Sequence, residues 1–184
     1  MLQLALFLAG SAAIVWLSWR SLRSLRSHGF YRFFAFELLW GLILVNVPVW
    51  FHDPWSPRQF VSYFLGIVSI ALAIEGFRLL AMIGKPSAAA PALDTNLAFE
   101  NTTKLVTVGA YRLIRHPLYA SLLALGWTAW LKSPLKWSSI VLTVGVTAFL
   151  SATAIAEEKE NLARFGESYA AYMSHTRRFV PFLF

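Results

Sequence analysis

The stretch Gly-Ala-Tyr-Arg-Leu-Ile-Arg-His-Pro-Leu-Tyr at residues 109–119 organises this chain. It places two tyrosines, two arginines and a histidine at the start of an apolar run. Pro117 suits the first turn of a helix, where its missing N–H costs nothing and its fixed φ already fits. The free N–H groups and partial positive charge of such a turn favour an anionic ligand group. The stretch therefore predicts a helix start beside a polar site, to which Arg115 and His116 add charge or hydrogen bonds.

Apolar residues dominate the rest of the chain. Hydrophobic residues make up 58% of the sequence and charged residues only 14%, which is far from soluble proteins and typical of membrane proteins. The length of 184 residues predicts one domain. Because cysteine is absent, disulfides, thiolate nucleophiles and cysteine metal sites are excluded. We attribute the net charge of +7 to basic cytoplasmic loops and expect no nucleic-acid partner.

Five apolar runs predict membrane-spanning helices, each of which needs about 20 residues to cross a bilayer. We therefore expect an all-α, polytopic membrane protein with about five transmembrane helices. A cleaved signal peptide is the alternative for the first run, but basic residues follow that run and none precedes it. The expected spans are residues 2–19, 33–51, 60–82, a short one at 117–131, and 137–156.

The chain reads as a single membrane domain, residues 1–184, in three parts. Residues 1–83 hold the first three spans. Residues 84–108 contain prolines, asparagines and few charges, which predicts a cytoplasmic loop; loops of this length are often functional lids. Residues 109–184 form the core of the site, with two spans and an amphipathic tail in which Gly166 predicts a helix stop.

The distribution of basic residues predicts the orientation. If the spans alternate, only Arg58, Lys132 and Lys136 of the 16 Lys and Arg residues fall on one side, which leaves thirteen on the other. The basic side is cytoplasmic. We therefore expect an integral protein of a prokaryotic plasma membrane, with its N-terminus outside, its C-terminus inside and a cofactor site on the cytoplasmic face.

Two ordered groups of residues carry a family resemblance. The first is Leu-Val-x-x-Gly-x-Tyr at residues 105–111, followed by Arg-His-Pro-x-Tyr at residues 115–119. The second comprises Glu157, Glu158, Phe165, Gly166, Tyr169, Tyr172 and Pro181. Together they resemble the isoprenylcysteine carboxyl methyltransferase family, and phospholipid N-methyltransferases share much of this signature. The resemblance covers roughly residues 100–184, whereas residues 1–99 match only in being membrane spans.

The resemblance implies an integral membrane methyltransferase that uses S-adenosylmethionine. Its acceptor would be a lipophilic molecule or membrane lipid, methylated on O, N or S. Arg115, His116 and Glu157 are the expected catalytic residues. The positions that match the family's cofactor pocket are Leu105, Val106, Tyr111, His116, Pro117, Tyr119, Glu157 and Glu158.

The adjacent glutamates cannot share one partner, because neighbouring residues on a helix lie about 100° apart. The resemblance assigns Glu157 to a polar group of the cofactor, and Glu158 is better suited to fixing local structure, for example with Arg115. For Tyr169 and Tyr172, packing against the membrane surface is the simpler interpretation.

Other ionisable residues receive simpler interpretations. Glu75 and Arg78 are placed to pair across one helical turn, and a functional role for ionisable groups at this depth in a span is the alternative. His28, His52 and His175 are isolated in the sequence and receive no role. No histidines and carboxylates show metal-ligand spacing, so we expect no metal.

Residue 153 departs from the family. The family has an Arg four residues before the first glutamate, one helical turn away, where it holds the acceptor carboxylate. Here Thr153 occupies the substrate position and cannot make a bidentate contact with a carboxylate. We therefore predict that prenylcysteine analogues are poor substrates. Arg78, Arg112 and Arg115 are the alternatives that would bring positive charge to the same space.

Two other functions stay open. Membrane sterol-type C=C reductases also carry an Arg/His-Pro-x-Tyr segment and would use NADPH, but they usually place an acidic residue soon after that Tyr, where this chain has Ala120 and Ser121. A non-enzymatic membrane scaffold explains the spans but not the polar residues of the 109–119 stretch. A Rossmann fold is disfavoured because Gly-x-Gly-x-x-Gly is absent. No pattern sets an oligomeric state.

Overall fold

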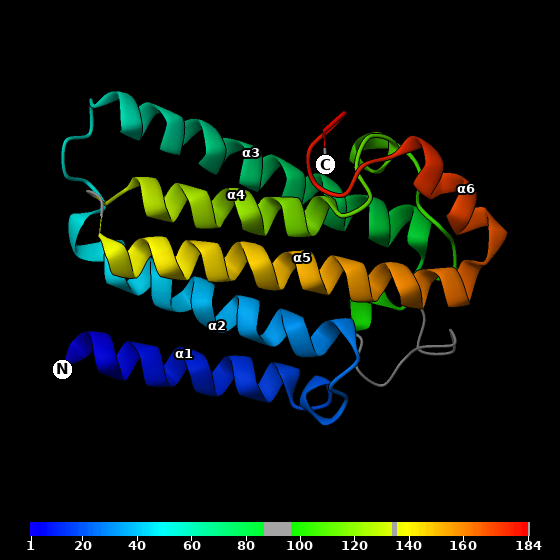
Figure 1. Cartoon of the computed structure of the whole chain (residues 1–184), viewed down its shortest axis with the longest axis horizontal. Helices are drawn as coiled ribbons and strands as arrows, with labels where there is room; N and C mark the ends of the chain where they lie inside the picture. Colours follow the sequence, from blue (N-terminus) through cyan, green and yellow to red (C-terminus); the bar gives the residue numbers. More distant parts are fainter. Residues whose placement is uncertain (87–96, 134–135, 184) are drawn as a thin grey trace.

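The computed structural model describes residues 1–86, 97–133 and 136–183, and within these ranges the chain forms helices and no strand. The predicted all-α fold is confirmed. Five long helices lie side by side, and a sixth, shorter helix follows them (Figure 1). Their bounds are α1 Leu2–Ser18, α2 His28–Asn46, α3 Pro57–Leu79, α4 Pro117–Leu131, α5 Trp137–Phe165 and α6 Glu167–His175. Short turns of helix are η1 Ser21–Arg23, η2 Val47–Val49, η3 Leu80–Gly84, η4 Ala98–Glu100 and η5 Gly109–Arg112.

Three stretches are long and apolar enough to cross a membrane: His28–Val49, Pro57–Gly84 and Trp137–Phe165. They support an integral membrane protein. Helix α1 is apolar but has 17 residues, and α4 has only 15. The count of five spans therefore stays a prediction.

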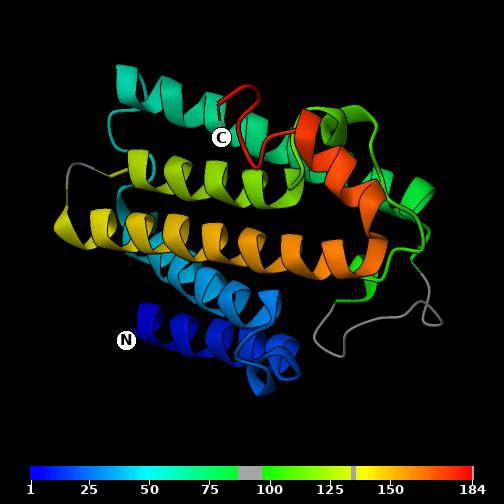
Figure 2. The same cartoon turned by 45° about the vertical axis from the view of Figure 1, so that its right-hand side comes forward.

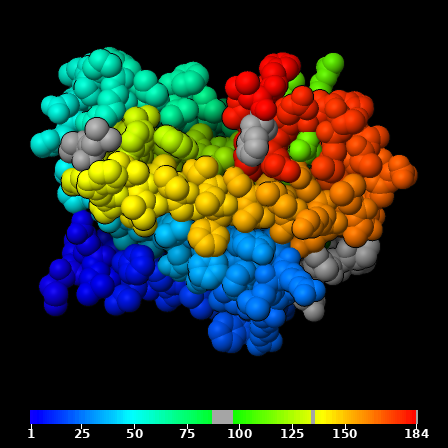
Figure 3. Space-filling view, in the orientation of Figure 1, coloured from blue at the N-terminus to red at the C-terminus, as the bar shows by residue number. Residues whose placement is uncertain are grey.

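The helices stack in the order α1, α2, α5, α4, α3, which differs from their order in the chain (Figure 1). Helix α2 packs along α5, α3 packs along α4, and α4 also contacts α5 and α2. Helix α1 packs on α2 at the edge of the stack. At the opposite end from the N-terminus, α6 turns away from α5 and lies beside the loop that precedes α4 (Figure 2). The last residues and α6 together cover this end of the bundle (Figure 3).

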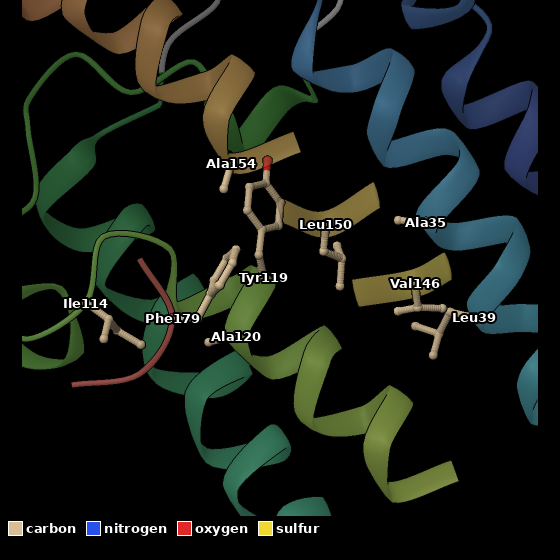
Figure 4. Packing of buried hydrophobic residues seen from close by; sticks show 9 residues of the cluster. All are labelled: Ala35, Leu39, Ile114, Tyr119, Ala120, Val146, Leu150, Ala154 and Phe179. Carbon is tan, nitrogen blue, oxygen red and sulfur yellow. The ribbon is translucent and has the colours of Figure 1, made fainter. Parts of the chain in front are cut away.

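The buried core joins the central helices to the segments around the motif (Figure 4). Alanines from α2, α4 and α5 allow close approach of the helix backbones, as small residues do in membrane bundles. Ile114 and Phe179 bring the loop before α4 and the C-terminal segment (residues 176–183) into the same core. The cluster consists of Ala35, Leu39, Ile114, Tyr119, Ala120, Val146, Leu150, Ala154 and Phe179.

Two helix boundaries differ from the sequence prediction. Helix α2 begins at His28 rather than at residue 33, because the Ser27 side chain caps it by accepting a hydrogen bond from the Phe30 N–H at 3.2 Å. Arg32 therefore lies inside α2 and not in a loop. Helix α5 joins the predicted span at residues 137–156 to the helix predicted from Glu157 to Arg164, and it continues without a break to Phe165, since the intervening residues are good helix formers. The predicted break at Gly166 is confirmed, with a φ of 55°.

The structure describes part of the loop predicted at residues 84–108. Residues 87–96, on which the expectation of a lid mainly falls, lie outside the described residues. The described remainder contains η4 and leads into η5. Thr103 ties this remainder to the end of η3 by donating its N–H to the Gly84 carbonyl at 2.8 Å.

Candidate functional site

A cavity of about 350 Å³ lies at the end of the bundle that carries the motif. This volume is within the usual range of small-molecule sites, about 300–1,000 Å³. One part of its wall is apolar and comes from α2, α3 and α4, with Phe36, Ala73, Leu122 and Leu125 among its residues. The polar part is formed by Arg32, Ser69, Glu100, Thr102, Lys104, Tyr111, Arg115, His116, Tyr119, Ser121, Glu157, Asn161, Tyr169 and Tyr172.

Gly109 shapes the loop that presents Tyr111 to the cavity. Its φ is 59°, and a Cβ at this position would overlap Glu75 Oε1 and lie 2.7 Å from Leu79 Cδ1. Glu75 instead accepts a hydrogen bond from the Ala110 N–H at 3.0 Å. Glu75 therefore fixes the start of η5. The pairing predicted between Glu75 and Arg78 is not found among the described residues.

The C-terminal segment pairs with the residues just before α4. The Arg115 N–H donates to the Arg177 carbonyl at 2.7 Å, and the Arg177 N–H donates to the Leu113 carbonyl at 3.2 Å. The His116 N–H donates to the Arg178 carbonyl at 3.2 Å. This short parallel pairing, centred on Ile114 and Arg177, fixes the backbone that carries His116.

Helix α6 adds two buried tyrosines to the same wall. Tyr169 is 2% exposed and Tyr172 is 8% exposed, and both line the cavity. The Tyr172 hydroxyl donates to the Tyr111 carbonyl at 2.6 Å. The expectation that these tyrosines pack against the membrane surface is wrong, because the turn at Gly166 folds α6 back over the motif. Burial raises the pKa of both hydroxyls, so they remain protonated hydrogen-bond donors.

His116 lies between the two adjacent glutamates of α5. Its Nδ1 is 3.7 Å from Glu157 Oε2, and its Nε2 is 3.6 Å from Glu158 Oε1. The ring stacks on Tyr119, with centroids 5.4 Å apart and planes 16° apart. Burial, together with the nearby charge of Glu157, raises the pKa of the Tyr111 hydroxyl above its usual value. The cavity therefore combines an imidazole, a carboxylate and neutral phenols.

The two glutamates face different partners, as their angular offset on α5 requires. Glu157 lines the cavity. Glu158 accepts a hydrogen bond from Arg115 Nε at 2.8 Å and from Arg178 Nη2 at 3.0 Å. Arg115 also donates to the Thr176 carbonyl at 2.5 Å. Glu158 and Arg115 thus join α5, the motif and the C-terminal segment.

A second cluster of charged residues adjoins the cavity and was not anticipated from the sequence. His28 Nδ1 is 2.5 Å from Glu160 Oε2, and its Nε2 is 3.3 Å from Glu100 Oε2. Arg32 Nη1 donates to Glu100 Oε1. Burial alone would raise the pKa of the Glu100 carboxyl, but Arg32 and His28 lower it to about 2. Glu100 is therefore ionised at neutral pH.

The interpretation of His28 as an isolated residue without a role is thus wrong. Its placement four residues before Arg32, one helical turn away, is the only signal that the sequence offers. Ionisable groups at the end of a membrane helix are functional or paired by default, and here they are paired. Glu100 is the last residue of η4 and lies 68 residues from Arg32 in the chain, and no local pattern marks it.

Most of the residues predicted to bind the cofactor or to act in catalysis lie together. Leu105, Val106, Tyr111, Arg115, His116, Tyr119 and Glu157 line the cavity.

Three others do not line it. Pro117 begins α4, and Glu158 faces the arginines. Thr153 is fully buried, and its hydroxyl donates to the Phe149 carbonyl at 2.7 Å, as helical threonines commonly do. The Thr153 hydroxyl is therefore occupied by its own helix, and its assignment to the substrate stays a prediction.

Comparisons with known proteins agree with these features. The sequence profile of the isoprenylcysteine carboxyl methyltransferase (ICMT) family matches residues 67–164, more than half of the chain. Two similar proteins, from Oryza sativa subsp. indica and subsp. japonica, are both named probable protein-S-isoprenylcysteine O-methyltransferase. Each is 32% identical over 126 residues, which is 67% of this chain and 63% of the relative. The match therefore spans less than two thirds of the relatives' length.

No solved structure matches the chain significantly. The family match leaves the sterol-reductase alternative without support. It includes the motif before α4 and the glutamate pair of α5, which are the segments that form the cavity's polar wall. On this match, the chain belongs to the isoprenylcysteine carboxyl methyltransferase family.

Proposed function

We propose that this protein is an integral membrane methyltransferase that transfers a methyl group from S-adenosylmethionine to a lipophilic acceptor. The observation that supports this most directly is the composition of the cavity wall. Glu157, His116 and Tyr111 supply charge and hydrogen bonds at one part, while α2, α3 and α4 supply apolar side chains at the other. A charged cofactor and an apolar acceptor therefore each meet a matching surface.

The residues present fit this cofactor. S-Adenosylmethionine supplies a methyl group that is already activated by its sulfonium sulfur. The Glu157 carboxylate suits its cationic or hydroxyl groups, and Leu105 and Val106 offer apolar contact to its adenine. The buried Nε2 of His116 faces Glu158 at 3.6 Å, whereas its Nδ1 lies 3.7 Å from Glu157 on the cavity wall. His116 and Glu157 can therefore meet one polar group of the ligand.

The chain's own residues would act mainly by alignment. Holding two reactants in a productive geometry is worth about 7–11 kcal/mol, and the buried aromatic wall excludes water, which strengthens electrostatic interactions inside the site. An amine or thiol acceptor must lose a proton, and His116 beside Glu157 is the available base. An anionic acceptor needs no base. Arg115 is a positioning residue, because it holds Glu158 and the C-terminal segment.

Alanine at His116 or at Glu157 is expected to weaken S-adenosylmethionine binding about 5–150-fold, the range for losing a hydrogen bond to a charged group. Isothermal titration in detergent or nanodiscs measures this directly. His175→Ala and Glu167→Ala are matched controls, since both side chains are exposed on α6, and they are expected to bind as the unchanged protein does. Wild-type affinity in both folded test variants would overturn the assignment.

We further propose that the N-terminus is outside the cell and that the site faces the cytoplasm. When the basic residues that lie inside α2, α3 and α5 are left out, nine remain on the proposed cytoplasmic side against two, still a clear excess. Reporter fusions at the C-terminus and in the turn between α2 and α3 are expected to report opposite sides. A C-terminus outside the cell would place the cavity away from soluble cofactor and contradict the proposal.

A further inference from the structure

Arg32 is a buried cation that the proposed reaction does not yet use. It lies in the second turn of α2, is 2% exposed and lines the cavity. Its Nη1 donates to Glu100 and lies 3.4 Å from His28 Nε2. Within the described part of the chain, its Nε and Nη2 are buried without any hydrogen-bond partner. A buried donor left unpaired costs about 1–3 kcal/mol, and more when it is charged.

The two unpaired nitrogens form one edge of the guanidinium plane. Their N–H bonds point in the same direction, so this edge presents two parallel donors. Such a fork matches the two oxygens of a carboxylate. Glu100 occupies Nη1 and leaves this edge free. The geometry therefore favours a bidentate oxyanion over a single hydrogen-bond acceptor.

The neighbouring charges fit the same ligand. Arg115, another arginine on the cavity wall, is bound to Glu158 and to the Thr176 carbonyl, whereas Glu157 brings negative charge to the wall. Arg32 and Glu157 thus offer opposite charges to one ligand space. Arg32 brings positive charge to the cavity wall from α2, whereas Thr153 of α5 is neutral and does not line the cavity. It lies outside residues 67–164, the part matched by the family profile.

We infer that the free Nε–Nη2 edge of Arg32 is a carboxylate-binding site in this cavity. The inference rests on the proposed function, because that function supplies two sources of the carboxylate. One is the amino-acid end of S-adenosylmethionine, whose ammonium group would then face Glu157. The other is a lipophilic acceptor that carries a carboxylate, such as a prenylcysteine.

Paired ligands distinguish the sources. Titrations of the unchanged protein and of Arg32→Lys would use S-adenosylmethionine against its decarboxylated form, and acetyl-farnesylcysteine against its methyl ester. Lysine keeps the charge beside Glu100 but lacks the planar fork. If the cofactor is the source, Arg32→Lys weakens S-adenosylmethionine binding about 10–150-fold and leaves the decarboxylated form unaffected. If the acceptor is the source, Arg32→Lys weakens the binding of acetyl-farnesylcysteine by the same factor and leaves the binding of its methyl ester unaffected.

Glu100→Gln is the control for a purely structural role, because it disturbs the same cluster without touching the free edge. It leaves the free edge in place, so the preference for the ligand that carries the carboxylate is expected to remain, whereas Arg32→Lys removes it. The ligand comparisons on the unchanged protein need no variant, so they still test whether the cavity recognises a carboxylate if Arg32→Lys folds poorly. Equal affinities within both ligand pairs would overturn the carboxylate site. Failure of the unchanged protein to bind either form of the cofactor would instead overturn the proposed function, and the acceptor pair would still decide on Arg32.

Discussion

Replacing Glu158 with glutamine is expected to lower the free energy of unfolding by about 3–5 kcal/mol, the range for removing one partner of a buried ion pair. The side chains of Glu158 and Arg115 are 5% and 9% exposed. Without the carboxylate, the Arg115 guanidinium loses its counter-charge, whereas the Arg178 side chain, 26% exposed, keeps access to solvent. The loss therefore arises mainly at Arg115. Thermal or denaturant unfolding of the purified protein measures it.

The matched control is Glu167→Gln, because Glu167 is exposed at the start of α6. Its effect is expected to stay within about 0.5 kcal/mol, as for most surface substitutions. If the two glutamine variants unfolded at the same denaturant concentration, the buried pair would not have the role assigned to it. Weaker cofactor binding by Glu158→Gln is expected as well, since His116 lies beside this carboxylate.

Replacing Gly109 with alanine is expected to lower the free energy of unfolding by about 2–5 kcal/mol. A positive φ accounts for about 1–2 kcal/mol, and forcing a methyl group against Glu75 and Leu79 adds about 1–3 kcal/mol. Displacing η5 also moves Tyr111, so S-adenosylmethionine affinity is expected to fall with stability. Unfolding curves and isothermal titration report the two effects separately.

Gly166→Ala measures the cost of backbone strain at a positive φ without the steric overlap that a Cβ meets at position 109. Gly166 also has a positive φ, 55°, but a Cβ there meets no atom within 4 Å. This variant is expected to show only the backbone strain and to bind cofactor normally. Equal losses in the two alanine variants would show that Glu75 and Leu79 do not crowd position 109.

The features that the sequence predicted depend on local patterns. Pro117 marks the start of α4 and Gly166 marks the end of α5, because each acts through its own backbone. The division of Glu157 and Glu158 follows from helix geometry alone. The membrane helices follow from apolar runs. These rules place the motif and the glutamates at one end of the bundle without knowledge of any distant contact.

The features that the sequence missed depend on distant partners. Arg32 meets Glu100 across 68 residues, and Tyr172 meets the Tyr111 carbonyl across 61. No local pattern encodes such pairings, so His28 looked isolated and Tyr172 looked like a surface residue. The start of α2 differs from the prediction for a local reason. Ser27 caps the helix, but the first residues of the helix are not apolar enough to mark a span.

The pairing between the motif and the C-terminal segment also sets an order of events during synthesis. Arg115 leaves the ribosome 61 residues before Thr176, its backbone partner. At about 5–20 residues per second, that gap lasts roughly 3–12 seconds. A chain interrupted before residue 176 would already contain all five long helices yet lack the C-terminal segment that pairs with the backbone of His116. Translation must therefore pass residue 178 before this pairing can form.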